Sequence, residues 1–150
     1  MKKSNKAREL FRNGYNCAQS VFCAFADEVG MDFETALKLS SSFGGGMGRL
    51  REVCGTVSAI LMIAGLKYGY TSSNDDEAKG NHYALVQELA KKFEAKHGSL
   101  ICRELLGLDV KHDDPKTEKR TEQYYISRPC EEFAASAAEI LSDYISKHKA

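Results

Sequence analysis

Five cysteines carry the strongest chemical signal in this sequence, because four of them share one kind of position. Each of the four falls within about the first turn of an expected helix, where partial positive charge and unpaired N–H groups favour thiolate over thiol. A thiolate attacks disulfides and binds metals. Burial alone, the usual reason for a core cysteine, does not require that turn. The four, each with a preceding helix-starting residue in parentheses, are Cys17 (Asn16), Cys54 (Glu52), Cys102 (Ser99) and Cys130 (Pro129).

The fifth cysteine, Cys23, lacks such a position. In an amphipathic helix over 16–29, apolar residues such as Val21 and Phe22 share one face, and Cys23 lies about 140° from the centre of that face. We therefore expect it to be an ordinary surface or interface cysteine. The other four are spread over most of the chain without a Cys-x-x-Cys pair. That spacing argues against a thioredoxin-like site and a structural zinc ribbon, and leaves a cluster built from four helix ends open.

The elements that must position these cysteines are helices. Apolar residues recur at spacings of three and four with almost no strict alternation, which predicts an all-α fold. The helix over 52–68 is apolar nearly all round and is expected at the centre, covered by its neighbours. We predict a compact, single-domain bundle of about six to seven helices spanning 1–150. The expected helices cover 4–13, 16–29, 33–41, 52–68, 75–97, 99–106 and a last segment that begins at Pro129.

Two loops connect these helices in ways that bear on the cysteines. The glycine loop Gly44 to Arg49 is better explained as a tight turn that delivers Cys54 than as a phosphate site, because it lacks the Gly-Lys-Ser/Thr ending of a P-loop. The charged stretch 109–128 is expected to be a surface excursion. His82 and His97 share a helix face, but lie too far apart along the axis to bind one metal and are expected to pack or cap.

Composition and charge exclude several classes of function. Hydrophobic residues make up 43% and charged residues 28% of 150 residues, which is ordinary for a globular protein and excludes a disordered one. Lysine plus arginine and aspartate plus glutamate are 21 each, so the formal charge is zero, and no basic block is present. We therefore expect no nucleic-acid partner. The longest apolar run, 53–66, is too short and too interrupted to span a membrane.

The first twelve residues are charged and contain no apolar segment of the kind that a signal peptide needs. We therefore expect the protein to be cytoplasmic. In that reducing compartment, five cysteines are better explained as free, metal-bound or redox-cycling thiols than as a permanent disulfide framework.

Several segments resemble one known family. They are the stretch 14–19 (GYNCAQ), the glycine loop followed by 52–55 (EVCG), the stretch 99–107 (SLICRELLG), and Pro129-Cys130. Together they are similar to the C_GCAxxG_C_C family of bacterial and archaeal proteins, which is named for its cysteines and described as redox-active. Its four signature cysteines correspond to Cys17, Cys54, Cys102 and Cys130. The sequence departs from the Cys-Gly-Ala-x-x-Gly motif at Thr56 and Ala59.

The resemblance implies redox chemistry, and genes of the family often lie near transporters. A related domain in split-Soret cytochromes implies electron transfer and an iron–sulfur site. We predict a thiol-dependent redox protein with Cys17, Cys54, Cys102 and Cys130 as catalytic residues in dithiol/disulfide exchange or electron transfer. In the alternative, the same four cysteines are metal ligands of an iron–sulfur cluster or another thiolate-bound metal. In a third, they are structural in a noncatalytic interaction module for a membrane transporter. The redox partner, and whether the chain is a homodimer, stay open.

Overall fold

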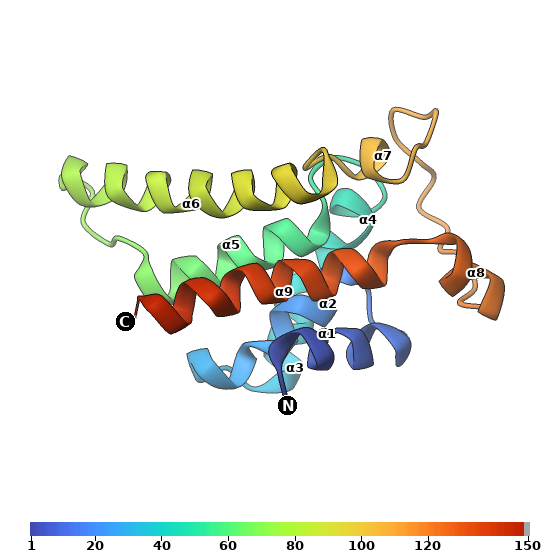
Figure 1. Cartoon of the computed structure of the whole chain (residues 1–150), viewed down its shortest axis with the longest axis horizontal. Helices are drawn as coiled ribbons and strands as arrows, with labels where there is room; N and C mark the ends of the chain where they lie inside the picture. Colours follow the sequence, from blue (N-terminus) through green and yellow to red (C-terminus); the bar gives the residue numbers. More distant parts are fainter. Residues whose placement is uncertain (149–150) are drawn as a thin grey trace.

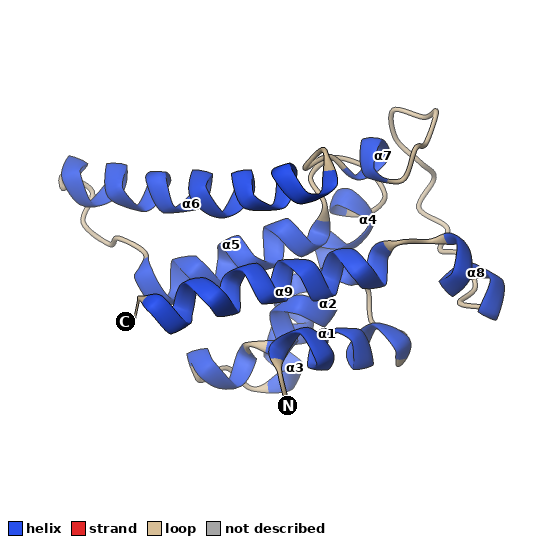
Figure 2. Cartoon of the chain, in the orientation of Figure 1, coloured by secondary structure: helices blue, strands red, loops and turns tan. Residues whose placement is uncertain are grey.

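The computed structural model describes residues 1–148, and within that range the elements are helices, without a strand (Figure 2). The all-α prediction is confirmed. In chain order the helices are α1 (Lys3–Arg12), α2 (Cys17–Ala24), α3 (Phe33–Ser40), α4 (Gly44–Met47), α5 (Gly55–Tyr68), α6 (Asp76–His97), α7 (Cys102–Leu105), α8 (Glu122–Ser127) and α9 (Cys130–Lys147), with 3-10 turns at Ala26–Val29 and Ser41–Phe43.

Helix α5 is the centre of the fold, as its apolar sequence predicts. It contacts α2, α6 and α9, and its buried residues include Val57, Ile60 and Ile63. Figure 1 shows α5, α6 and α9 extended along the long axis of the molecule, with α1, α2 and α3 beneath them. Helices α5 and α9 both begin at the end where α4, α7 and α8 lie, so their N-termini are brought together there.

Large apolar side chains fix this arrangement. Five of them are fully buried: Phe22 in α2, Phe25 at its C-cap, Ile60 in α5, Phe93 in α6 and Leu141 in α9. Burying one such side chain stabilises the folded state by about 1.5–3 kcal/mol. The register of these helices, and with it the position of each N-terminus, is therefore set by core packing.

The start of α2 is held by a capping box that ties it to a neighbouring helix. The Asn16 side chain accepts a hydrogen bond from the Gln19 backbone N–H (2.8 Å), and the Gln19 side chain accepts one from the Asn16 N–H (3.1 Å). This satisfies two N–H groups that would otherwise lack partners. The amide groups of the same two side chains donate to the carbonyl oxygens of Ser41 and Leu37. The first residue of α2, Cys17, is thereby held against the segment that follows α3.

Two helices begin later than the sequence predicts, for one reason. Val53 forms an isolated antiparallel bridge with Ile101, so the residues around each are extended. As a result α5 begins at Gly55 with Cys54 as its N-cap, and α7 begins at Cys102 with Ile101 as its N-cap. Ser99, predicted to cap that helix, instead accepts a hydrogen bond from the Ile101 N–H and donates one to Glu104.

The prediction that Cys23 lies at a surface is wrong, because only 2% of it is exposed. Helix α2 is covered by α1, α3, α5 and α9. All of its residues from Ser20 to Ala24 are buried, so it has no solvent-facing side there. The apolar stripe that identified one buried face did not show that the other faces are also covered. Burial raises the pKa of Cys23 to about 11.

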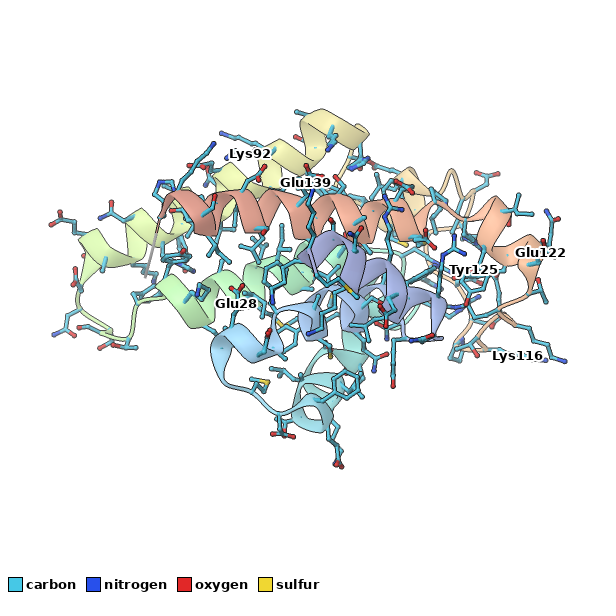
Figure 3. All side chains as sticks on the ribbon, turned by 60° about the horizontal axis from the view of Figure 1, so that its bottom comes forward. Glu28, Lys92, Lys116, Glu122, Tyr125 and Glu139 are labelled. Atoms are coloured by element: carbon cyan, nitrogen blue, oxygen red, sulfur yellow. The ribbon has the colours of Figure 1, made fainter. Side chains whose placement is uncertain are left out.

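The charged stretch 109–128 is mostly exposed, as expected of a surface excursion, but it is held against the rest of the fold. Its helix α8 folds back against α1: the Tyr125 hydroxyl donates to the Arg12 carbonyl (3.3 Å), and its ring meets Phe11 edge-on at 5.9 Å. In Figure 3, Glu122 and Tyr125 mark α8 at one end of the molecule, and Lys116 marks the loop before it. Residues 107–129 are called the lid segment below.

The glycine loop packs closely against Cys102 and Arg51 at Gly46. Gly46 has φ of +69°, and a Cβ there would lie 2.7 Å from the Cys102 Cβ and 2.8 Å from the Arg51 Cα. The left-handed backbone costs a residue with a Cβ about 1–2 kcal/mol. We expect Gly46→Ala to lower the free energy of unfolding in urea by at least about 2 kcal/mol.

The matched control is Gly80→Ala in α6, where an added Cβ meets nothing within 4 Å. Since alanine is the better helix former, we expect this variant to be more stable than wild type by about 0.5–1 kcal/mol. Equal stability of the two variants would contradict the close contact at Gly46.

Candidate functional site

A cavity of about 370 Å³ lies where α2, α5, α7 and α9 begin, and four cysteines line it. Cys17 and Cys130 are the first residues of α2 and α9, Cys102 is the first of α7, and Cys54 is the N-cap of α5. The predicted position of these cysteines at helix starts is therefore confirmed. The sulfurs form no disulfide, and Cys23 does not line the cavity.

Backbone pairing joins the segments that carry Cys54 and Cys102. The Cys54 N–H donates to the Leu100 carbonyl (2.8 Å), and the Cys102 N–H donates to the Glu52 carbonyl (2.6 Å). These bonds flank the bridge between Val53 and Ile101. In an antiparallel pair, residues one step on from a bridged pair lie on the same face. Cys54 and Cys102 are therefore held on one side of this short ladder.

Cys17 reaches the start of α5 because residue 55 is glycine. A Cβ on Gly55 would lie 2.8 Å from the Cys17 Sγ and 2.6 Å from the Phe43 carbonyl oxygen. Any side chain at this position would displace the sulfur or the backbone. The Gly45 and Ala18 backbone N–H groups lie near the Cys17 sulfur and lower its pKa, which in part offsets burial. The glycine loop thus contacts two of the cysteines, Cys17 through Gly45 and Cys102 through Gly46.

Cys54 and Cys102 are buried, and Cys17 and Cys130 are half-buried. For Cys17, Cys54 and Cys130, removal of the thiol from water overturns the expectation of a lowered pKa. Burial raises the pKa of Cys17, of Cys130, and of Cys54 to about 12. Charge on one sulfur further opposes charge on the next: Cys17 has this effect on Cys54 and Cys130, and Cys102 has it on Cys17. Removal from water outweighs the stabilisation that a helix N-terminus gives to a thiolate.

Thr56 is a site residue that the sequence did not identify. It is fully buried, lines the cavity, and has its hydroxyl oxygen 3.1 Å from the Cys54 sulfur. This hydrogen bond lowers the pKa of Cys54, in part offsetting burial. The sequence did contain a signal for Thr56. It is a polar residue two positions after a cysteine, at the start of an otherwise apolar helix, and the family motif has alanine there.

Arg51 places a positive charge beside Cys102. Its side chain is only 5% exposed, and its guanidinium donates to the Cys102 sulfur at 3.6 Å and to Asp113 at 3.2 Å. Burial opposes the charge, but the hydrogen bonds to Cys102 and Asp113 outweigh it and raise the pKa of Arg51. Its Nε is buried without a hydrogen-bond partner among the described residues. Local pattern in the sequence gave no sign that Arg51 lies beside a cysteine.

The backbone that carries this arginine is strained. Arg51 has φ of +59° and Arg49 has φ of +69°, a region that costs residues other than glycine about 1–2 kcal/mol each. Two hydrogen bonds hold the conformation, from the Arg51 N–H to the Gly45 carbonyl and from the Glu52 N–H to the Gly46 carbonyl. Strain of this kind is concentrated at functional sites.

The lid segment closes one side of the cavity and is attached by ion pairs. Asp113 binds both Arg49 and Arg51, at 3.0 and 3.2 Å. Glu118 binds Arg128 at 2.6 Å and lies 3.8 Å from Arg49. The lid residues that line the cavity are Pro115, Thr117, Glu118, Arg120, Tyr124 and Arg128. The sequence treated this stretch as surface, and local spacing gave no sign that it covers the cysteines.

The four sulfurs are the kind of donor that a soft metal or an iron–sulfur cluster takes. Within residues 1–148, no group of three or more histidine, cysteine, aspartate or glutamate side chains is spaced to hold a metal ion. The histidines do not line the cavity. His97 packs against Phe93 and Phe133 and hydrogen-bonds Ser136 at 2.8 Å, in agreement with the packing role expected for it.

Comparison with known proteins identifies the family. The chain matches, over residues 15–144, the family described as "Putative redox-active protein (C_GCAxxG_C_C)", and it belongs to that family. The resemblance inferred from the cysteine segments is thus confirmed. No curated protein and no solved structure matches the chain. No helix within residues 1–148 combines the length and apolar character needed to cross a bilayer.

The burial of Cys54 predicts a specific dependence of stability on pH. Its pKa is about 12 in the folded protein, against about 8.5 in an unfolded chain. The unfolded chain therefore loses this proton first, so the contribution is complete below about pH 8.5 and is lost as the pH rises toward 12. We expect the free energy of unfolding to fall by about 2 kcal/mol between about pH 8 and 10 from this group alone.

Urea unfolding at the two pH values measures this, with Cys54→Ala compared with wild type. The alanine variant should lose less stability than wild type over this interval. Val57→Ala is the control, since Val57 is equally buried in α5 but does not titrate. A Cys54→Ala variant whose pH dependence equals that of wild type would show that Cys54 is not a buried neutral thiol.

Proposed function

We propose that this protein is a dithiol/disulfide redox protein, in which Cys102 and Cys17 are the exchanging pair. The observation that carries the proposal is the Arg51 guanidinium beside the Cys102 sulfur, in a cavity that four free cysteines line. Positive charge beside a sulfur favours the nucleophilic thiolate. The family description as redox-active supports the same chemistry.

The choice of partner for Cys102 follows from the contacts around Cys17. Cys102 and Cys17 lie close enough for charge on one sulfur to oppose charge on the other. The adjoining Gly45 and Gly46 contact Cys17 and Cys102 respectively, which keeps the two sulfur-bearing residues on one wall of the cavity. The Gly45 and Ala18 backbone N–H groups beside Cys17 in part offset the rise in its pKa that burial causes.

The reaction is a two-step exchange with a small-molecule disulfide. The Cys102 thiolate attacks one sulfur of the substrate, the substrate S–S bond breaks, and the first thiol leaves with the proton that Cys102 gave up. Cys17 then attacks the mixed disulfide at Cys102. A Cys17–Cys102 disulfide forms, and the second thiol leaves with the proton from Cys17. The protein pair loses two electrons, and the substrate disulfide gains them.

Cys102→Ser tests the proposal, since serine nearly preserves the volume but is neither ionised at neutral pH nor redox-active. The variant should lose only about 1–2 kcal/mol of stability and keep the circular dichroism spectrum of wild type. We expect reduced wild-type protein to lose two thiols on oxidation with 2-hydroxyethyl disulfide, by thiol titration in urea, and to regain them with a reductant. Peptide mapping should identify the Cys17–Cys102 bond, which the variant cannot form.

Cys23→Ser is the matched control, because Cys23 is equally buried and lies outside the cavity. It should oxidise reversibly like wild type. A Cys102→Ser protein that still forms one reversible disulfide at the wild-type rate would contradict the assigned pair. Anaerobic purification followed by elemental analysis tests the metal alternative, and iron or zinc lost in Cys102→Ser would overturn dithiol exchange. If the protein shows neither reversible oxidation nor bound metal, the noncatalytic interaction module is the hypothesis that remains.

A further inference from the structure

The cavity around the cysteines carries an excess of positive charge. Four arginines line it, whereas the only carboxylate among the lining residues is Glu118. Asp113, from just outside the lining, pairs with two of the arginines. Four guanidinium groups therefore face two carboxylates. The arginines are Arg49, Arg51, Arg120 and Arg128.

Arg120 is the arginine whose charge is left uncompensated. No carboxylate of residues 1–148 forms an ion pair with it. Its guanidinium donates to the backbone carbonyls of Phe11 and Tyr15, both at 3.0 Å, and lies 4.2 Å from the centre of the Phe11 ring and 5.1 Å from that of Tyr124. A guanidinium has five N–H donors, so three remain after these two bonds. The aromatic rings hold this cation in one position at the cavity wall.

The cavity wall strengthens the effect of this charge. Phe11, Leu105, Leu106 and Phe133 contribute apolar surface, so the interior is less polar than water. Electrostatic interactions in such a site are stronger than in bulk solvent, and a cleft lined by one sign of charge concentrates ligands of the other sign. An anion is therefore favoured inside, and a cation is excluded.

We propose that the substrate of the cysteine pair is a small disulfide that carries carboxylate groups, bound by Arg120 at the cavity wall. This inference rests on the proposed function and names its substrate class. Arg120 and Arg128 also exert an electrostatic effect on two of the cysteines, Cys17 and Cys130, which places both cations close enough to the sulfurs to act on a bound molecule. As the substrate S–S bond breaks, negative charge develops on the leaving sulfur before it takes up the proton from the cysteine, and the same cations stabilise that charge.

Three disulfides of similar size but different charge test the proposal: 3,3′-dithiodipropionate with two negative charges, 2-hydroxyethyl disulfide with none, and cystamine with two positive charges. The rate of thiol loss is measured for each, and is divided by its rate with the same chain unfolded in urea. That ratio removes the intrinsic reactivity of each reagent. We expect the folded protein to favour the dianion over the dication by about tenfold or more at low ionic strength.

Salt and substitution locate the source of the preference. Raising the salt from about 0.01 M to about 1 M shortens the screening length from about 30 Å to about 3 Å, and should reduce the preference several-fold. Arg120→Gln should reduce it similarly, while Arg120→Lys should retain most of it because the charge is kept. Lys92→Gln is the control of equal charge change. Lys92 is exposed on α6 (Figure 3), where it pairs with Glu88.

The neutral disulfide separates the two proposals. If it oxidises Cys17 and Cys102 but the dianion is no faster than the dication, the substrate class is wrong and the dithiol function stands. If no disulfide oxidises the pair, the proposed function itself fails. If Arg120→Gln loosens the lid segment, all three normalised rates rise together. The ratio of the dianion rate to the dication rate then still measures the preference for negative charge. An unchanged ratio in Arg120→Gln would overturn the role of Arg120.

Discussion

The short pairing between 52–54 and 100–102 is the interaction on which the site depends. It holds two segments extended where helical spacing would continue them as helices, and it ends each at a cysteine that begins a helix. Because α5 is the packed centre of the fold, anchoring its start also anchors α7 and the base of the lid segment. The glycine loop then fits against this pairing only because Gly46 and Gly55 leave room for Cys102 and Cys17.

Burial, more than position at a helix N-terminus, sets the pKa of these thiols. Desolvation raises the pKa of Cys17, Cys54 and Cys130, and arginines place positive charge beside the sulfurs, which the proposed exchange reaction needs. The strained backbone at Arg49 and Arg51 aims both side chains at Asp113 of the lid segment, and Arg51 also at Cys102. The same residues therefore place positive charge beside a sulfur and hold the lid segment over the cavity.

Much of the fold followed from local pattern. The apolar centre at α5, the start of α2 after Asn16 and the start of α9 at Cys130 depend on residues within a few positions of each other. The late starts of α5 and α7 could not be foreseen, since a bridge between Val53 and Ile101 joins residues far apart in the chain. Cys23 was misplaced for a related reason: periodicity identifies one buried face, but neighbouring helices decide how many faces are covered.

The sequence by itself determined which cysteines begin helices, the all-α class and, through the four cysteine segments, the family. Only the tertiary structure decided that these four side chains line one cavity, that Arg51 and Arg120 reach it, and that Thr56 hydrogen-bonds Cys54. Helix starts are encoded by neighbours in sequence. The solvation of a thiol and the charge around it are sums over every segment packed nearby, so they exist only once the chain has folded.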